Sequence, residues 1–266
     1  DVPGLVRRLA RAENVRRLPR ECRRDRSNEV WVIVDVARRL IPVESDYLQI
    51  IAEVEGMQGK ANVRLWCVSE SPEHAFWVQR GKGRQKGVRG GIPTPPPGTA
   101  VLILGDLGLL SPNRVAVAPW LALCKRVAEG GARPVAWVPL SPRLVTRAVA
   151  RHAQVHCLGA GDLRPLNPAR CAEAPVLPVE GLEALLTRIA CCVRLEPALL
   201  RSLRLMQADT AAEPGLEALV WGHGAVVETG SFRFCAIATH CQGDYRARFG
   251  GLESKQQDEV LRRMLV

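Results

Sequence analysis

The chain has 266 residues, 47% of them hydrophobic, so it is long enough for one large domain or for a medium domain with an appendage. Its net charge of +10 comes almost entirely from arginine, because lysine occurs only five times. A basic balance favours an acidic partner such as nucleic acid, although a GC-rich genome produces the same arginine bias. The apolar runs are far shorter than a membrane span, and we find no signal peptide, which excludes a membrane-protein class.

The nine cysteines are scattered and form no Cys-x-x-Cys pair, so the sequence does not predict a structural zinc site. Cys67, Cys124 and Cys157 stand in apolar runs typical of core positions. An odd number of cysteines in a chain of this kind indicates a reducing compartment, and we expect a cytoplasmic protein.

Residues 1–28 form a basic N-terminal extension with nine arginines. Acidic residues interrupt the charge, which favours a solvated helix on the outside of a domain over an arm that binds nucleic acid.

Two short apolar runs each end in an aspartate. Val30–Val34 is uninterrupted and rich in β-branched residues, which is typical of a strand buried on both faces, and Asp35 follows it. Ala100–Leu104 repeats the pattern and leads to Asp106. Open α/β sheets bind ligands at the carboxyl ends of their strands, so neighbouring strands here would place both carboxylates at one functional edge.

The other segments of this region alternate between strand and helix patterns. We expect strands at 62–68, 74–79, 133–138 and 154–158, and helices after Glu44, over 115–129 and after Ser141-Pro142. This alternation predicts an α/β domain over residues 29–160, with a mostly parallel sheet flanked by helices.

A segment at 80–98 interrupts the pattern with six glycines, four prolines, five basic residues and no acidic residue. It cannot form regular structure, and its spacing does not match a Walker loop. Its basic side chains are candidates for contact with a nucleic-acid backbone or another phosphate; the alternative is a solvated loop. These candidates are Arg80, Lys82, Arg84, Lys86 and Arg89.

A Pro- and Gly-rich linker is expected at 161–180, followed by a helical region over 181–266. Amphipathic helices are predicted at 181–193, 197–206, 215–221, 244–249 and 254–265. Because the pattern is still helical at the last residue, we expect this region to continue into a further domain.

With both aspartate strands placed, residues 29–160 resemble a von Willebrand factor A (vWA) domain. The resemblance implies a Rossmann-like sheet with a metal site built from Asp-x-Ser-x-Ser, a threonine and a second aspartate. Asp35 and Asp106 match the two aspartates, and Thr94 is a displaced counterpart of the threonine. Ala37 and Arg39 occupy the two serine positions, so the resemblance implies a degenerate site. We expect no resident cofactor, and Mg²⁺ is the ion that a surviving site would bind.

The chain is more closely similar to vWA-like proteins that accompany MoxR-type AAA ATPases in bacterial conflict systems. That resemblance implies a cytoplasmic antiviral-defence protein with an AAA ATPase partner and a downstream effector, often a formylglycine-generating-enzyme-like (C-type-lectin-like) domain. It rests on seven segments: Arg16-Arg-Leu-Pro-Arg-Glu-Cys-Arg-Arg24, Val32-Ile-Val-Asp-Val-Ala-Arg-Arg-Leu-Ile-Pro42, Leu104-Gly-Asp-Leu-Gly108, Arg133-Pro-Val-Ala-Trp-Val-Pro139, Arg194-Leu-Glu-Pro-Ala-Leu-Leu-Arg201, Gly215-Leu-Glu-Ala218 and Trp221-Gly-His223.

Three functions compete at this point. The first is a non-catalytic interaction or scaffold module. The second is a nucleic-acid-binding protein that uses the 80–91 loop and the N-terminal arginines, with binding that weakens steeply in salt. The third is an enzyme, but a metal-dependent hydrolase normally needs more acidic ligands than Asp35 and Asp106. His152 and His156 near Cys157, and His223 and His240 near Cys235 and Cys241, lack an activating motif.

Overall fold

The computed structural model describes residues 29–78, 91–111, 114–132, 134–158, 164–173, 178–206, 208–211, 213–229 and 231–265. Contacts divide the chain into two compact units. Unit 1 holds the residues up to Asp35 together with Ile51–Pro175, and unit 2 holds Val36–Ile50 together with Val176–Val266. This division differs from the one expected from the sequence, because Val36–Ile50 belongs with the C-terminal region and not with the α/β domain.

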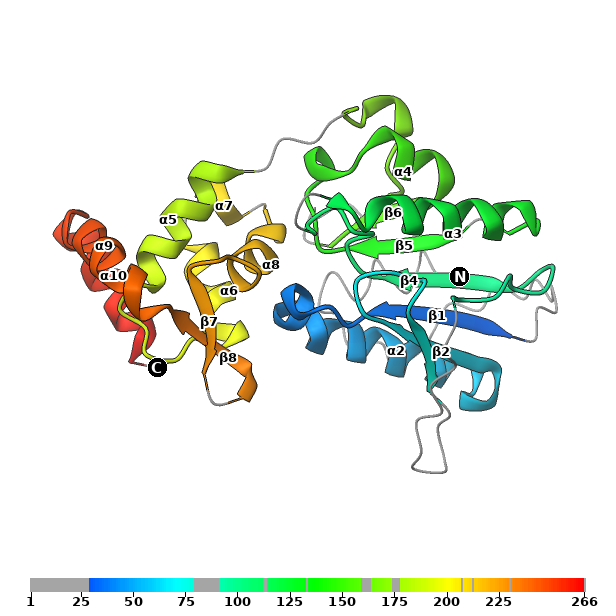
Figure 1. Ribbon diagram of the computed structural model, residues 1–266, viewed down its shortest axis with the longest axis horizontal. Coiled ribbons are helices and arrows are strands. Elements are labelled where there is room, and N and C mark those ends of the chain that lie inside the picture. The colour runs from blue at the N-terminus through cyan, green and yellow to red at the C-terminus, as the bar shows by residue number, and fades with distance from the viewer. Residues whose placement is uncertain are drawn as a thin grey trace. The chain divides into compact units, whose positions relative to one another are not determined.

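Unit 1 is built on a six-stranded sheet in the order β3-β2-β1-β4-β5-β6 (Figure 1). All neighbouring strands are parallel except β3, which is an antiparallel edge strand beside β2. The strands are β1 (Val30–Asp35), β2 (Val63–Val68), β3 (Ala75–Val78), β4 (Ala100–Leu104), β5 (Val135–Val138) and β6 (Gln154–Cys157). This arrangement confirms the predicted α/β class with a Rossmann-like, mostly parallel sheet.

The uninterrupted apolar runs form the centre of the sheet, as their composition predicts. In β1, Val32 and Ile33 are fully buried, and in β4 so are Ile103 and Leu104. Side chains that alternate between the two faces of a strand are all buried only when both faces are covered. Helix α3 (Val117–Glu129) contributes Trp120 to the buried core of unit 1.

The helix expected after Ser141-Pro142 is interrupted. The structure has a 3-10 turn, η4 (Pro142–Leu144), and a separate helix α4 (Arg147–His152). Val145 between them has an extended backbone, and the Thr146 hydroxyl accepts a hydrogen bond from the Val149 amide at 3.4 Å. The threonine therefore caps a new helix, a local signal that competes with continuation of the first turn.

Unit 2 is largely helical, as predicted, but it also contains a β-hairpin that the sequence analysis missed. The hairpin pairs β7 (Val226–Thr229) with β8 (Ser231–Ile237). β-branched and aromatic residues on both sides of Thr229-Gly-Ser231 were the available signal. The helices of this unit are α5 (Val179–Ile189), α6 (Pro197–Leu205), α7 (Ala208–Ala211), α8 (Gly215–Trp221), α9 (Thr239–Gly250) and α10 (Ser254–Met264).

One hydrophobic cluster joins these elements. Leu185, Leu200, Leu216 and Trp221 are fully buried in it, together with Cys235 of the hairpin. Leu195 and Cys235 exchange backbone hydrogen bonds of 2.8 and 3.1 Å, which attach the hairpin to the chain before α6. Unit 2 therefore has a core of its own.

Ion pairs fix the early segment Val36–Ile50 inside unit 2. This segment comprises the 3-10 helix η1 (Arg38–Val43) and the start of α2 (Glu44–Gln58). Arg201 of α6 contacts Asp46 at 2.7 Å and donates a hydrogen bond to the Pro42 carbonyl at 3.1 Å. Glu217 of α8 accepts from Arg201 at 3.4 Å and from Arg204 at 2.7 Å. Residues far apart in sequence thus share one charged network.

We expect Glu217→Ala to lower the free energy of unfolding of unit 2 by about 3–5 kcal/mol, because it leaves a buried guanidinium without its carboxylate. The side chains of Arg204 and Glu217 are only 7% and 1% exposed. The measurement is urea unfolding followed by circular dichroism. Glu183→Ala is the control, because its ion pair with Arg248 is largely exposed and should contribute under about 1 kcal/mol. Equal losses of unfolding free energy in both variants would show that the buried Arg204–Glu217 pair matters no more than an exposed pair.

Candidate functional site

The two aspartates lie at the carboxyl ends of adjacent parallel strands, β1 and β4. The strand register pairs Val34 with Leu104, so Asp35 and Gly105 follow at the same level of the sheet. A Cβ atom added at Gly105 would lie 2.8 Å from the Asp35 Cβ, which shows how closely the two chains approach. This is the point where the strand order reverses, the usual ligand-binding position of an open α/β sheet.

Asp106 is fully buried and organises the turn that follows β4. Its Oδ1 accepts a hydrogen bond from the Gly108 amide and its Oδ2 accepts one from the Leu110 amide, both at 2.9 Å. Inside this turn Leu107 has a left-handed backbone with φ 54°. The carboxylate therefore stabilises a tight turn in the way that Asx turns do, with both oxygens directed at the main chain.

Asp35 is 1% exposed and plays a related role one strand away. Its Oδ1 accepts a hydrogen bond from the Glu70 amide at 3.1 Å, after the end of β2. Glu70 has a left-handed backbone with φ 67°, and its carbonyl accepts a hydrogen bond from Trp120 Nε1 of α3 at 2.9 Å. Asp35 thus connects β1 to the β2 loop and, through it, to α3. Glu70 and Trp120 were missed by the sequence analysis, because no local motif marks their contact across 50 residues.

The remaining residues of the predicted metal site are placed differently. Thr94 is exposed, while both aspartates are buried. Ala37 and Arg39 are buried residues that belong to unit 2. Within the described residues, no group of three or more His, Cys, Asp or Glu side chains is arranged to hold a metal ion. The basic candidates Arg80, Lys82, Arg84, Lys86 and Arg89 lie outside the described residues.

Of the cysteine and histidine residues weighed as nucleophilic sites, Cys157, His156 and Cys235 are buried, His152, His223 and Cys241 are half-buried, and His240 is exposed. Cys157 is 2% exposed in β6, and His156 beside it makes a 3.0 Å contact with the side chain of Gln154. In unit 2, burial raises the pKa of the Cys235 thiol to about 12. A thiol with so high a pKa is protonated near neutral pH, and the thiolate is the nucleophilic form. The eight cysteines among the described residues are free thiols.

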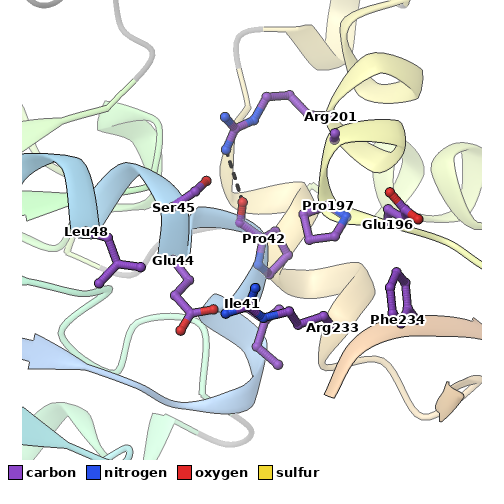
Figure 2. Close-up of a pocket in the computed structure, with 11 residues that line it drawn as sticks. Ile41, Pro42, Glu44, Ser45, Leu48, Glu196, Pro197, Arg201, Arg233 and Phe234 are labelled. Carbon is purple, nitrogen blue, oxygen red and sulfur yellow. Dashed lines mark hydrogen bonds between the residues drawn. The ribbon is translucent and has the colours of Figure 1, made fainter. Parts of the chain in front are cut away.

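A groove of about 380 Å³ opens within unit 2, where the start of α2, the start of α6 and strand β8 meet (Figure 2). Its apolar lining comes from Ile41, Pro42, Leu48, Pro197, Ala198 and Phe234. Glu44, Glu196 and Arg233 are polar lining residues, and Arg201 reaches the Pro42 carbonyl at one side, as Figure 2 shows. Leu48 is 52% exposed, so the groove presents an aliphatic side chain to solvent.

No protein-family model, curated protein or solved structure matches this chain. Among the described residues, no helix is both long enough and apolar enough to span a membrane.

We expect Asp106→Asn to destabilise unit 1 by about 2 kcal/mol, because an amide can accept only at one atom and its NH₂ group would face a main-chain donor. The measurement is thermal unfolding with and without millimolar Mg²⁺. If Asp106 acts only as an acceptor for the turn, Mg²⁺ leaves the wild-type transition unchanged. A rise in the wild-type melting temperature with Mg²⁺ that disappears in the variant would instead mean a working metal site.

Gly108→Ala should destabilise unit 1 by more than about 2 kcal/mol, through left-handed backbone strain and a clash together. Gly108 has φ +75°, and an added Cβ would lie 2.6 Å from the Ala116 carbonyl carbon. Gly131→Ala is the matched control, because Gly131 has φ +83° and nothing within 4 Å of an added Cβ. Urea unfolding of both variants separates the cost of the left-handed backbone, which both share, from the cost of the clash, which only Gly108→Ala has. A control that loses as much stability would show that the close approach to Ala116 is unimportant.

Proposed function

We propose that this chain is a non-catalytic, vWA-like protein-interaction module with a degenerate metal site. Its partner is a MoxR-type AAA ATPase in a bacterial conflict system with a downstream effector. The observation that carries the proposal is the use of Asp35 and Asp106 as buried acceptors for backbone amides. A catalytic or metal-binding site at this edge of the sheet would need the same two carboxylates.

The positions of the aspartates support the vWA-like part of the proposal. One follows the first strand and the other follows the fourth, and these strands are neighbours in the sheet. At the two serine positions of the family signature, Ala37 offers no oxygen and Arg39 brings a cation. A divalent ion prefers oxygen ligands, so the chain has lost chemistry that the family site requires.

The groove of unit 2 is the surface that we assign to the partner. It combines a half-exposed Leu48 with Phe234 and two prolines. An aliphatic side chain of the partner would pack well against this lining. Glu44 and Glu196 are exposed acidic residues in the lining and Arg233 is an exposed basic one, while Arg201 is engaged by Asp46 and Glu217. A partner segment with an aliphatic side chain next to a basic residue would complement this surface.

The test is a binding titration between the purified chain and a purified MoxR-type ATPase. Leu48→Arg should weaken binding by at least about tenfold, because a charge enters the apolar part of the contact. Leu205→Arg is the matched control, because Leu205 is 54% exposed and does not line the groove.

Three results would count against the proposal. The first is no ATPase binding, and the second is equal weakening by both variants. The third is tight binding of duplex DNA that falls steeply with added salt, which would favour the nucleic-acid alternative.

A further inference from the structure

A second cavity, of about 500 Å³, lies within unit 1 between helix α4 and the 3-10 turn η5 (Pro168–Arg170). Arg147 and Arg151 of α4 line one side, and Asn167, Pro168 and Ala169 line the other. Among the described residues, no acidic side chain is part of the lining. The cavity is therefore a concave basic site, separate from the sheet edge and from the groove of unit 2.

The two arginines are one helical turn apart, a spacing at which like charges repel. Arg147 Nη1 contacts Glu173 at 3.0 Å, but the Glu173 side chain is 82% exposed, so this pair is weak. The Nε atom of Arg147 is buried and has no hydrogen-bond partner. Arg151 is exposed and forms no ion pair with another described residue. Two guanidinium groups thus face the cavity with unused donors.

The opposite wall is held in place by the backbone. The Arg147 amide donates to the Ala172 carbonyl at 2.9 Å, which attaches the chain after η5 to the first turn of α4. Asn167 Oδ1 accepts from the Ala169 amide at 3.0 Å, so the donor end of this side chain is left for a ligand. These hydrogen bonds connect the two walls of the cavity and shape the η5 wall.

We propose that this cavity binds the phosphate group of a small phosphorylated molecule through Arg147 and Arg151. Guanidinium groups bind phosphate oxygens with paired hydrogen bonds, and a phosphate has enough terminal oxygens for both arginines. A dianion between them would remove their mutual repulsion. The volume falls in the range of small-molecule sites, which favours a small ligand over a polymer backbone.

The test is isothermal titration of inorganic phosphate and pyrophosphate into the full chain at constant ionic strength. Arg151→Gln should weaken binding by at least about tenfold, as expected for the loss of a charged hydrogen-bond donor. Because Arg151 is exposed and unpaired, this variant should fold normally, and circular dichroism checks that it does. Arg147→Gln should have an effect of similar size.

Arg262→Gln in α10 is the control for net charge, because it removes an equal charge from an exposed position in unit 2. Binding that is lost in both cavity variants and kept in this control supports the proposal. The absence of saturable binding by either probe would overturn it. Equal weakening in Arg262→Gln, or acetate binding as tight as phosphate binding, would also overturn it, since either result means nonspecific attraction of anions.

Discussion

Three carboxylates of this chain, those of Asp35, Asp106 and Glu217, are exposed by 1% or less, and the structure around them is arranged to supply donors. A buried carboxylate without such donors costs several kcal/mol. Backbone amides meet this need for the two aspartates, and guanidinium groups meet it for Glu217. The turn after β4, the loop after β2 and the position of Val36–Ile50 in unit 2 all depend on this constraint.

The same constraint bears on function. The edge where the strand order reverses is the usual ligand-binding place of an open α/β sheet. Here its two carboxylates stabilise turns, and the close packing of Gly105 against Asp35 leaves little space beside them. Carboxylates that face solvent can bind a metal ion. These two accept hydrogen bonds from main-chain amides and so stabilise the fold. The proposed interaction module rests on this observation.

The two cavities differ in chemistry, and each belongs to a single unit. In unit 2 the groove joins an apolar lining to charged residues of both signs, Glu44, Glu196 and Arg233, and we assign it to a protein segment. In unit 1 the cavity between α4 and η5 is lined by two arginines, and the carboxylate that pairs with one of them, Glu173, is not part of the lining; we assign this cavity to an anion.

The sequence by itself determined the parts of the protein that local pattern controls. Apolar runs predicted β1 and β4 and placed Asp35 and Asp106 at one edge, and alternation predicted the mostly parallel sheet. Only the tertiary structure decided that the aspartates accept from Glu70, Gly108 and Leu110. It also decided that Val36–Ile50 joins unit 2 and that residues 226–237 of this otherwise helical unit form the hairpin β7–β8. Residue periodicity reports which face of a segment is buried, but it does not report the partner. The pair Arg201–Asp46 joins residues 155 positions apart, and such partners are selected only when the whole core packs.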